Sequence, residues 1–263
     1  MVWKSAIIGV IYDIMRRITT LIVKNWHIPV SIAAIVFFVF FAWERIDPKL
    51  EMQTGNYYFN GGAYDLEKAE EAFKRALQAE PKILWGHYQL ARVYFVKGKK
   101  DKALEEINKE LEANPANLRS LYVRGLIYGY MPDLPRAEAD FERFVRWAPK
   151  EWAGYNDLAW ILAKEGKYSD AEKAAEEGIK EAIGGGQNAW LWNSLGVAQL
   201  NLKKYNDAEK SFRKALELAR NMTENEWARA YPGNNPKGSS GGLRSFKAAV
   251  EANLSKAVDK ASL

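Results

Sequence analysis

The sequence predicts an all-α protein in which stacked helix pairs follow a membrane-anchoring N-terminal region. The first observation is a repeat, because Pro81, Pro115 and Pro149 are spaced 34 residues apart. The same step separates four alanines, and a fifth follows after 37 residues: Ala69, Ala103, Ala137, Ala171 and Ala208. A fixed period of this length is typical of a solenoid, whose units bury too little surface to be stable alone. The second observation is an uncharged apolar stretch before the repeats, which predicts a membrane-spanning helix.

The composition supports a packed protein and argues against two kinds of site. Hydrophobic residues make up 48% of the 263-residue chain, which is enough for a core. The net charge is +5, but charges of both signs are interleaved, as at 67–77, and this is typical of a solvated helix surface. Because no one-sided basic stripe follows the N-terminus, we expect no nucleic-acid partner. The absence of cysteine excludes disulfides and thiolate metal ligands.

Residues 1–24 are predicted to form an amphipathic helix. Charged residues such as Lys4, Asp13 and Arg16 fall outside an apolar stripe with helical spacing. The stripe consists of Trp3, Ile7, Val10, Ile11, Ile14, Ile18, Leu21 and Ile22. Such a helix is too polar and too short to span a bilayer, so we expect it to lie on the membrane surface. Docking against another membrane subunit is the alternative.

Residues 25–45 are predicted to be a transmembrane anchor. No charge lies between Lys24 and Glu44, and the 18 residues from Trp26 to Trp43 come near the lower limit for spanning a hydrocarbon core of about 30 Å. Tryptophan at both ends suits the headgroup region. Four basic residues precede the span, whereas those that follow it are mixed with acidic ones, so the positive-inside rule places the N-terminus in the cytoplasm and the repeats outside it.

Residues 48–220 divide into five units with a shared skeleton. A small residue recurs in the first half of each unit, where two helices are expected to approach closely: Gly55, Ala91, Gly125, Ala159 and Gly196. Four positions after the repeated alanine comes a second column, which lies on the same helix face: Phe73, Ile107, Phe141, Ala175 and Phe212. Glycines mark the turn inside three units, and Pro135 is well placed to open a helix in the third.

This skeleton resembles the tetratricopeptide repeat (TPR) family. The second unit matches the family pattern at Leu90, Ala91, Tyr94, Ala103 and Pro115, and the fifth at Trp192, Leu195, Gly196, Ala208, Phe212 and Ala215. The resemblance covers about residues 48–220. Departures are local: the first unit carries two extra residues, Arg124 replaces the usual leucine in the third, and the fourth ends without a proline.

The resemblance implies a right-handed TPR α-solenoid whose concave wall comes from the first helix of each unit. The groove-facing positions of the family correspond here to Trp85, Tyr88, Arg92, Phe95, Arg119, Tyr122, Tyr130, Asn156, Trp160, Trp190 and Asn193. Among them, Asn156 and Asn193 occupy the same position in successive units, and their amides suit an extended peptide backbone. Arginines among aromatic residues suit a carboxylate or a polar hot spot. Ordinary packing between helices is the alternative role for all eleven.

Gly184, Gly185 and Gly186 account for the longer last step of the repeat. Glycine loses the most freedom on ordering, so three in a row predict a joint between the first four units and the fifth. An insertion in the turn between units is the alternative, and amide exchange across 180–190 as slow as in the neighbouring helices would exclude the joint.

After Arg220 the repeat pattern ends. Residues 221–242 are predicted to extend a helix toward Trp227 and then to form a Gly/Pro-rich loop at 231–242. Residues 243–263 are predicted to form a C-terminal capping helix, because apolar residues line one side of it and a solenoid needs its open end covered. A partner-binding tail is the alternative.

These features predict an interaction protein and no enzyme. His27 and His87 lack companions for a metal or catalytic site, so we expect no catalytic residue, cofactor or metal. The chain looks like single-pass TPR proteins of bacterial envelope machinery, which implies a membrane-anchored scaffold that recruits proteins in a bacterial inner membrane. The alternative is a permanent accessory subunit of an integral membrane complex, docked through helix 1–24 and the transmembrane helix.

Overall fold

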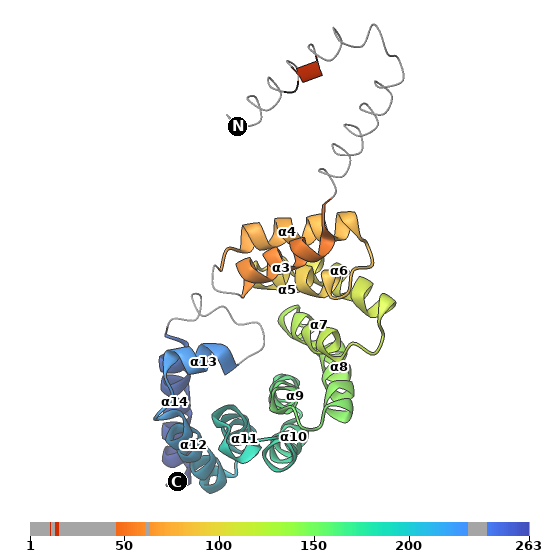
Figure 1. Ribbon diagram of the computed structural model, residues 1–263. Coiled ribbons are helices and arrows are strands. Elements are labelled where there is room, and N and C mark those ends of the chain that lie inside the picture. Colours follow the sequence, from red (N-terminus) through yellow and green to blue (C-terminus); the bar gives the residue numbers. More distant parts are fainter. Residues whose placement is uncertain (1–10, 12–13, 16–45, 61–63, 231–240, 263) are drawn as a thin grey trace, which may run out of the picture. The chain divides into compact units, whose positions relative to one another are not determined.

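The computed structural model describes residues 11, 14–15, 46–60, 64–230 and 241–262 (Figure 1). The chain forms two compact parts, residues 1–47 and 48–263, and each is described by itself. In the first part, Ile11, Ile14 and Met15 are helical and exposed. The predicted anchor at 25–45 and most of the predicted surface helix at 1–24 lie outside the described residues. Within the described residues, every helix is too short or too polar to cross a bilayer.

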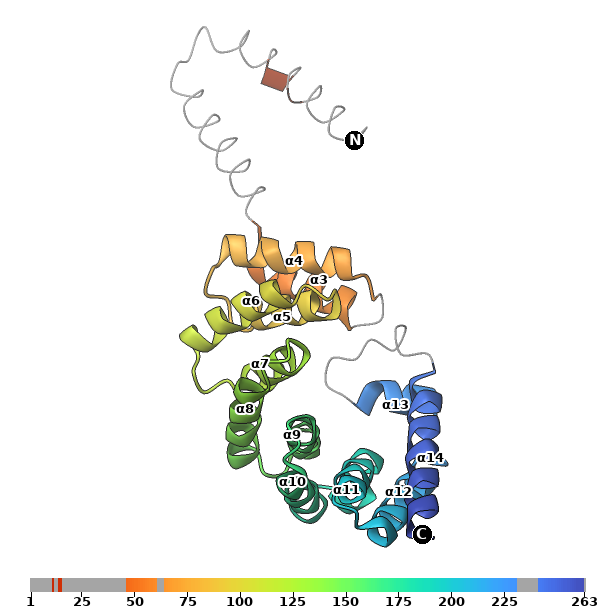
Figure 2. The same ribbon diagram turned by 180° about the vertical axis from the view of Figure 1, so that it is seen from behind.

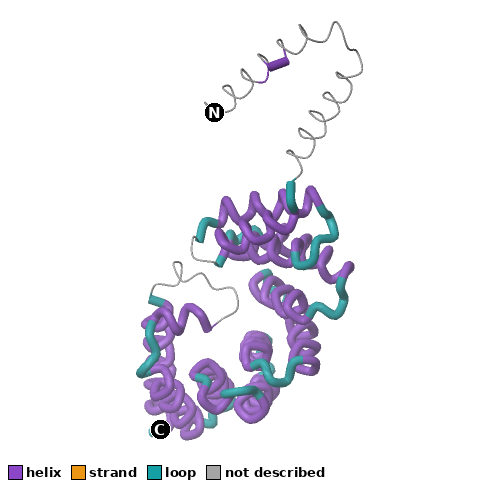
Figure 3. The backbone as a smooth tube through the Cα atoms, in the orientation of Figure 1, coloured by secondary structure: helices purple, strands orange, loops and turns teal. Residues whose placement is uncertain are grey.

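The second part confirms the all-α prediction, because its described residues contain helices and no strand (Figure 3). Its helices pair as α3 Pro48–Phe59 with α4 Leu66–Ala79, α5 Gly86–Val96 with α6 Lys100–Ala113, α7 Leu118–Tyr130 with α8 Leu134–Trp147, α9 Trp152–Lys164 with α10 Tyr168–Glu181, and α11 Ala189–Asn201 with α12 Tyr205–Ala219. Successive pairs stack along a curve, with α7 and α9 on its inner side and α8 and α10 outside them (Figures 1 and 2). The predicted solenoid is therefore confirmed.

In the first, third and fifth pairs, a phenylalanine ring of the second helix lies over a glycine of the first. In the first pair, a Cβ atom added to Gly55 would lie 2.4 Å from the ring of Phe73. In the fifth, one added to Gly196 would lie 2.7 Å from Phe212. Both phenylalanines are completely buried. A side chain at either glycine would therefore push the two helices apart.

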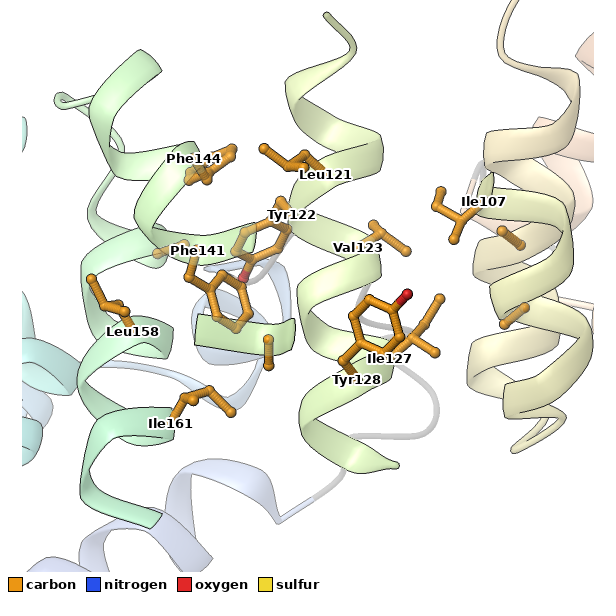
Figure 4. Close-up of a cluster of buried hydrophobic side chains, with 14 of the residues drawn as sticks. Ile107, Leu121, Tyr122, Val123, Ile127, Tyr128, Phe141, Phe144, Leu158 and Ile161 are labelled. Carbon is orange, nitrogen blue, oxygen red and sulfur yellow. The ribbon is translucent and has the colours of Figure 1, made fainter. Parts of the chain in front are cut away.

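One continuous core runs along the stack from Phe59 in the first pair to Ala198 in the fifth. Figure 4 shows its middle, where Phe141 and Phe144 of α8 point toward Tyr122 of α7. The ring centroid of Tyr122 lies 5.7 Å from that of Phe141 and 5.1 Å from that of Phe144. Because neighbouring pairs share this core, no pair is buried on its own.

A last helix, α14 Gly242–Ala261, packs along α12. Its Val250 and Ala257 are completely buried and form a separate cluster with Ala208, Phe212 and Ala215 of α12. Helix α14 thus covers apolar surface of the fifth pair, in the place that a sixth repeat would take.

The predicted helix extension toward Trp227 is wrong, because the chain breaks at Arg220 and restarts as α13 Glu224–Ala230. A capping box starts the new helix: Thr223 Oγ1 accepts from the backbone N–H of Glu226 at 3.2 Å, and the Glu226 carboxylate accepts from the N–H of Thr223 at 2.7 Å. The Glu224 carboxylate accepts in turn from the backbone N–H groups of Leu243 and Arg244, and so caps α14.

The turns inside the pairs use the left-handed backbone conformation. Gly98 and Gly166 have φ angles of +71° and +78°, as the sequence indicates for turn glycines. Lys203 takes this conformation in the fifth pair at +62°. The predicted turn glycine Gly62 lies outside the described residues, and Pro135 lies in the first turn of α8.

The three glycines at 184–186 lie in a compact turn between α10 and α11. Gly185–Gln187 forms a single 3₁₀ turn, η2, and the carbonyl of Gly186 accepts from Trp192 Nε1 at 2.9 Å. The backbone N–H of Ile183 donates to the carbonyl of Lys150, at the start of the fourth pair, at 3.1 Å. This arrangement agrees with a simple insertion in the turn between the fourth and fifth pairs. A flexible joint at this point would be a property of motion, so it stays a prediction.

We expect Gly196→Ala to lower the free energy of unfolding by about 1–3 kcal/mol, because the new methyl group overlaps the ring of Phe212. Gly186→Ala is the matched control. Its nearest neighbour to a Cβ atom is 3.9 Å away and its φ is not positive, so its stability should change by less than about 1 kcal/mol. Urea unfolding followed by circular dichroism compares the two. Equal losses would show that the ring contact does not set the helix spacing.

Candidate partner-binding groove

The inner side of the curve contains a cavity of about 460 Å³. Helices α5, α7, α9, α11, α13 and α14 contribute its walls. The lining side chains are Arg92, Phe95, Val96, Val123, Leu126, Tyr130, Asn156, Asp157, Trp160, Trp190, Asn193, Ser194, Trp227 and Phe246. A cavity of this size, mostly apolar with a few polar groups, is typical of a binding site.

Most of the residues predicted for the groove meet at this cavity. Seven line it: Arg92, Phe95, Tyr130, Asn156, Trp160, Trp190 and Asn193. Four do not: Trp85, Tyr88, Arg119 and Tyr122. Of these four, Tyr88 and Tyr122 are buried between helices, so their side chains support the wall from behind.

Aromatic side chains from three successive pairs form one wall. Phe95 of α5 meets Tyr130 of α7 edge-on at 5.6 Å between ring centroids, and Tyr130 meets Trp160 of α9 at 5.3 Å. Tyr130 remains 54% exposed although it is a large aromatic residue. The Lys164 ammonium lies 4.6 Å from the Trp160 ring centroid. The wall therefore offers apolar surface to a partner side chain.

A hydrogen-bonded network beside this wall joins three helices. The Tyr122 hydroxyl of α7 donates to Asp157 Oδ2 of α9 at 2.6 Å. Asn156 Nδ2 donates to Asp157 Oδ1 at 3.1 Å, and Ser194 Oγ of α11 donates to Asn156 Oδ1 at 2.8 Å. Because these groups are buried or half-buried, the bonds fix the relative positions of the three first helices.

Asn156 and Asn193 occupy the same repeat position in the sequence, but they differ in their hydrogen bonds. The Asn156 amide already bonds to Asp157 and Ser194 on both its oxygen and its nitrogen. Asn193 also lines the cavity, yet its amide bonds to no other described residue. Of the pair, Asn193 is therefore the better placed to bond to a partner's backbone.

Arg92 is a buried cation in the cavity wall, with only 9% of its surface exposed. Its guanidinium lies 4.6 Å from the Phe59 ring centroid and 5.4 Å from that of Tyr88, and Nη1 donates to Gln89 Oε1 at 2.7 Å. Among the described residues no carboxylate pairs with it. Burial lowers the pKa of Arg92, Tyr88 opposes the shift, and the charge of Arg119 lowers the pKa further. Arg92 therefore keeps donor capacity for a polar group of a ligand.

Trp85 and Arg119 extend this arrangement away from the cavity. The Arg119 guanidinium lies 5.9 Å from the Trp85 ring centroid, and Trp85 meets Tyr88 edge-on at 5.3 Å. Trp85 directly precedes α5 as its N-cap residue and has a left-handed backbone, with φ of +67°. These contacts give Trp85 and Tyr88 packing roles.

The C-terminal helices contribute residues that the repeat pattern does not predict. Trp227 of α13 stacks on Trp190 at 4.0 Å between ring centroids, and Phe246 of α14 lies 4.5 Å from Trp227. No periodic signal marks them, because both follow the last repeat. Asp157 and Ser194 were also missed, although each directly follows a predicted asparagine in successive units, and that shared position was a usable signal.

His87 takes part in a hydrogen-bonded cluster between α5 and α6. Its Nδ1 lies 2.6 Å from Glu106 Oε2, and Lys109 Nζ lies 2.8 Å from the other oxygen of that carboxylate. Burial raises the pKa of Glu106, but the hydrogen bonds from His87 and Lys109 outweigh it and lower the pKa overall. Within the described part of the chain, no three acidic or histidine side chains are grouped as a metal site.

Comparison with known families identifies the repeats. Three tetratricopeptide repeat family models match the chain, over residues 62–124, 122–186 and 189–222. Residues 62–222 are therefore tetratricopeptide repeats, as the sequence resemblance indicates. This class of protein provides a surface for protein–protein interaction.

Sequence relatives share these repeats over part of their length. A TPR repeat-containing protein of Methanocaldococcus jannaschii is 30% identical over 65% of this chain and 30% of its own length. Cellulose synthase operon protein C of Pseudomonas fluorescens is 29% identical over 43% of this chain and 9% of its own. The chain thus spans less than a third of either relative.

Solved structures share the fold. MamA from Desulfovibrio magneticus aligns with a TM-score of 0.60 and 18% identity, over 66% of this chain and 96% of that one. YrrB, described as a TPR protein with an unusual peptide-binding site, aligns with a TM-score of 0.55 and 19% identity, over 67% and 88%. These likenesses establish the solenoid architecture.

We expect Tyr122→Phe to lower the free energy of unfolding by about 1.5–3 kcal/mol, because it removes a buried hydrogen bond to a carboxylate. Tyr155→Phe is the matched control, since Tyr155 is as buried but its hydroxyl bonds to no described residue. The control should change stability by less than about 0.5 kcal/mol. Chemical denaturation of both variants measures the difference, and equal effects would mean that the network is not structural.

Proposed function

We propose that the repeats bind an extended segment of a partner protein in the groove, and that the protein serves as a scaffold. The cavity is the observation that carries this proposal, because it gathers seven predicted residues from successive pairs. The wall of Phe95, Tyr130 and Trp160 takes apolar side chains. Asn193 and Arg92 supply donors for polar groups of the segment. The peptide-binding site described for YrrB, which has the same architecture, supports this choice of ligand.

We also propose that the scaffold is tethered to a bilayer through residues 25–45, with the N-terminus cytoplasmic and the repeats on the far side of a bacterial inner membrane. The support comes from the sequence, in the uncharged span between Trp26 and Trp43 and in the basic residues before it. The exposed helical residues Ile11, Ile14 and Met15 suit a membrane-surface helix. Tethering raises the concentration of the groove near membrane clients.

A photoreactive benzoylphenylalanine in place of Tyr130 should crosslink to the partner, because that side chain is 54% exposed and lines the cavity. The control position is Trp147, which is 62% exposed but lies at the end of α8 outside the cavity. In the full-length protein expressed in its native cells, one defined adduct should form from position 130 and not from 147. Equal labelling from both positions, or labelling from 147 alone, would exclude the groove as the contact surface.

Alkaline carbonate extraction of the full-length protein should leave it in the membrane pellet. The double change Ile35→Lys with Val39→Lys should release it, since each lysine near mid-span adds about 2.5–3.5 kcal/mol to the cost of insertion. Ile35→Leu with Val39→Leu keeps the span apolar and should behave like the unaltered protein. Extraction of the unaltered protein into the soluble fraction would refute the anchor.

A further inference from the structure

Helix α13 brings one side chain of the protein into its own groove. Trp227 lies at the cavity with its ring stacked on Trp190 at an interplanar angle of 21° and 4.0 Å between centroids. On its other side, Trp190 stacks on Trp152 at 5.2 Å and 23°. Three indole rings thus lie in one pile, and the outermost belongs to an element that is not part of the repeats.

Trp152 and Trp190, the first two rings of this stack, belong to the repeats. Trp152 starts α9 and Trp190 lies in the first turn of α11, which Asn188 caps by accepting from the N–H groups of Trp190 and Leu191 at 3.0 and 3.1 Å. The face that Trp190 presents to the cavity is therefore preformed. A flat, preformed indole face favours another aromatic ring over an aliphatic side chain.

The outer member, Trp227, is attached more weakly. Its helix has only seven residues, and a helix of that length is marginal without tertiary contacts. Trp227 contacts Trp190 and Phe246, and packs at the edge of a small cluster of Ala189, Ala219 and Leu243. Glu224 ties the start of α13 to α14 by accepting from the N–H groups of Leu243 and Arg244, and Glu226 bonds to Thr223, so neither carboxylate bonds α13 to the repeats.

We infer that the Trp190 end of the groove is a subsite for an aromatic side chain of the partner, and that Trp227 fills this subsite in the unbound protein. This inference rests on the proposed function of the groove. The partner segment then carries a Trp, Phe or Tyr that stacks on Trp190, with its neighbours along the wall of Tyr130 and Phe95. Binding requires Trp227 to leave, so α13 lowers the affinity of the groove for any such segment.

A purely structural role for Trp227 makes a different prediction. If Trp227 serves to complete the cluster around Leu243, its removal lowers the stability of the repeats and leaves partner binding unchanged or weaker. If it fills a ligand subsite, its removal leaves the unfolding of the repeats nearly unchanged and strengthens binding. Trp227→Phe retains an aromatic ring at the position and should behave like the unaltered protein in either case.

The test is selection of a phage-displayed library of random peptides on the full-length protein and on its Trp227→Ala variant. We expect the variant to select peptides enriched in aromatic residues, and the unaltered protein and Trp227→Phe to bind these peptides at least tenfold more weakly. Trp190→Ala added to the variant should abolish their binding. Trp147→Ala, which removes an exposed tryptophan outside the cavity, should match the unaltered protein.

Three results would overturn the inference. Selected peptides without aromatic enrichment, or with equal affinity for the unaltered protein and the variant, would leave the groove as a binding site but remove the Trp190 subsite. A large loss of stability in Trp227→Ala, measured by thermal unfolding, would assign Trp227 to the fold. If none of the proteins selects any peptide, both this inference and the proposed peptide-binding function fail.

Discussion

The structure depends on a close approach between the paired helices, which in the first, third and fifth pairs places a phenylalanine over a glycine. Gly55 under Phe73 and Gly196 under Phe212 show this at the two ends of the stack. The pairs stack in succession, and their first helices follow one another along the inner side of the curve. The groove is a consequence of that repetition.

Within the groove, rigidity and recognition are assigned to different side chains. Hydrogen bonds join Tyr122, Asp157, Asn156 and Ser194 to one another. These bonds hold α7, α9 and α11 in fixed relative positions. Arg92, Asn193 and the exposed ring of Tyr130 are not used in this way. Arg92 differs from Arg124, a half-buried cation that pairs with Asp140 at 2.7 Å. A buried charge without an opposite charge costs stability, and such costs concentrate at functional sites.

The two helices that follow the repeats have different roles: α14 covers the end of the stack, and α13 brings a side chain to the cavity. A stack with an open end must cover it, and α14 does so with Val250 and Ala257 against α12. Helix α13 carries Trp227 to the cavity. The break between α12 and α13, started by the capping box at Thr223, makes this possible, because a continuous helix would have carried Trp227 away along the axis of α12.

The sequence by itself determined the helical class, the number of repeats and half of the residues that line the groove. Small and aromatic residues spaced by one period encode local helix contacts, which depend on few neighbours and so can be read from spacing. It did not predict that Asn156 bonds within the protein while Asn193 does not, nor which of the eleven positions serve packing. Those outcomes depend on which side chains from different pairs come within hydrogen-bond distance. Only the tertiary structure brought Trp227 and Phe246 to the groove, because their position follows from how α13 and α14 fold back on the fifth pair, and no period in the sequence records that contact.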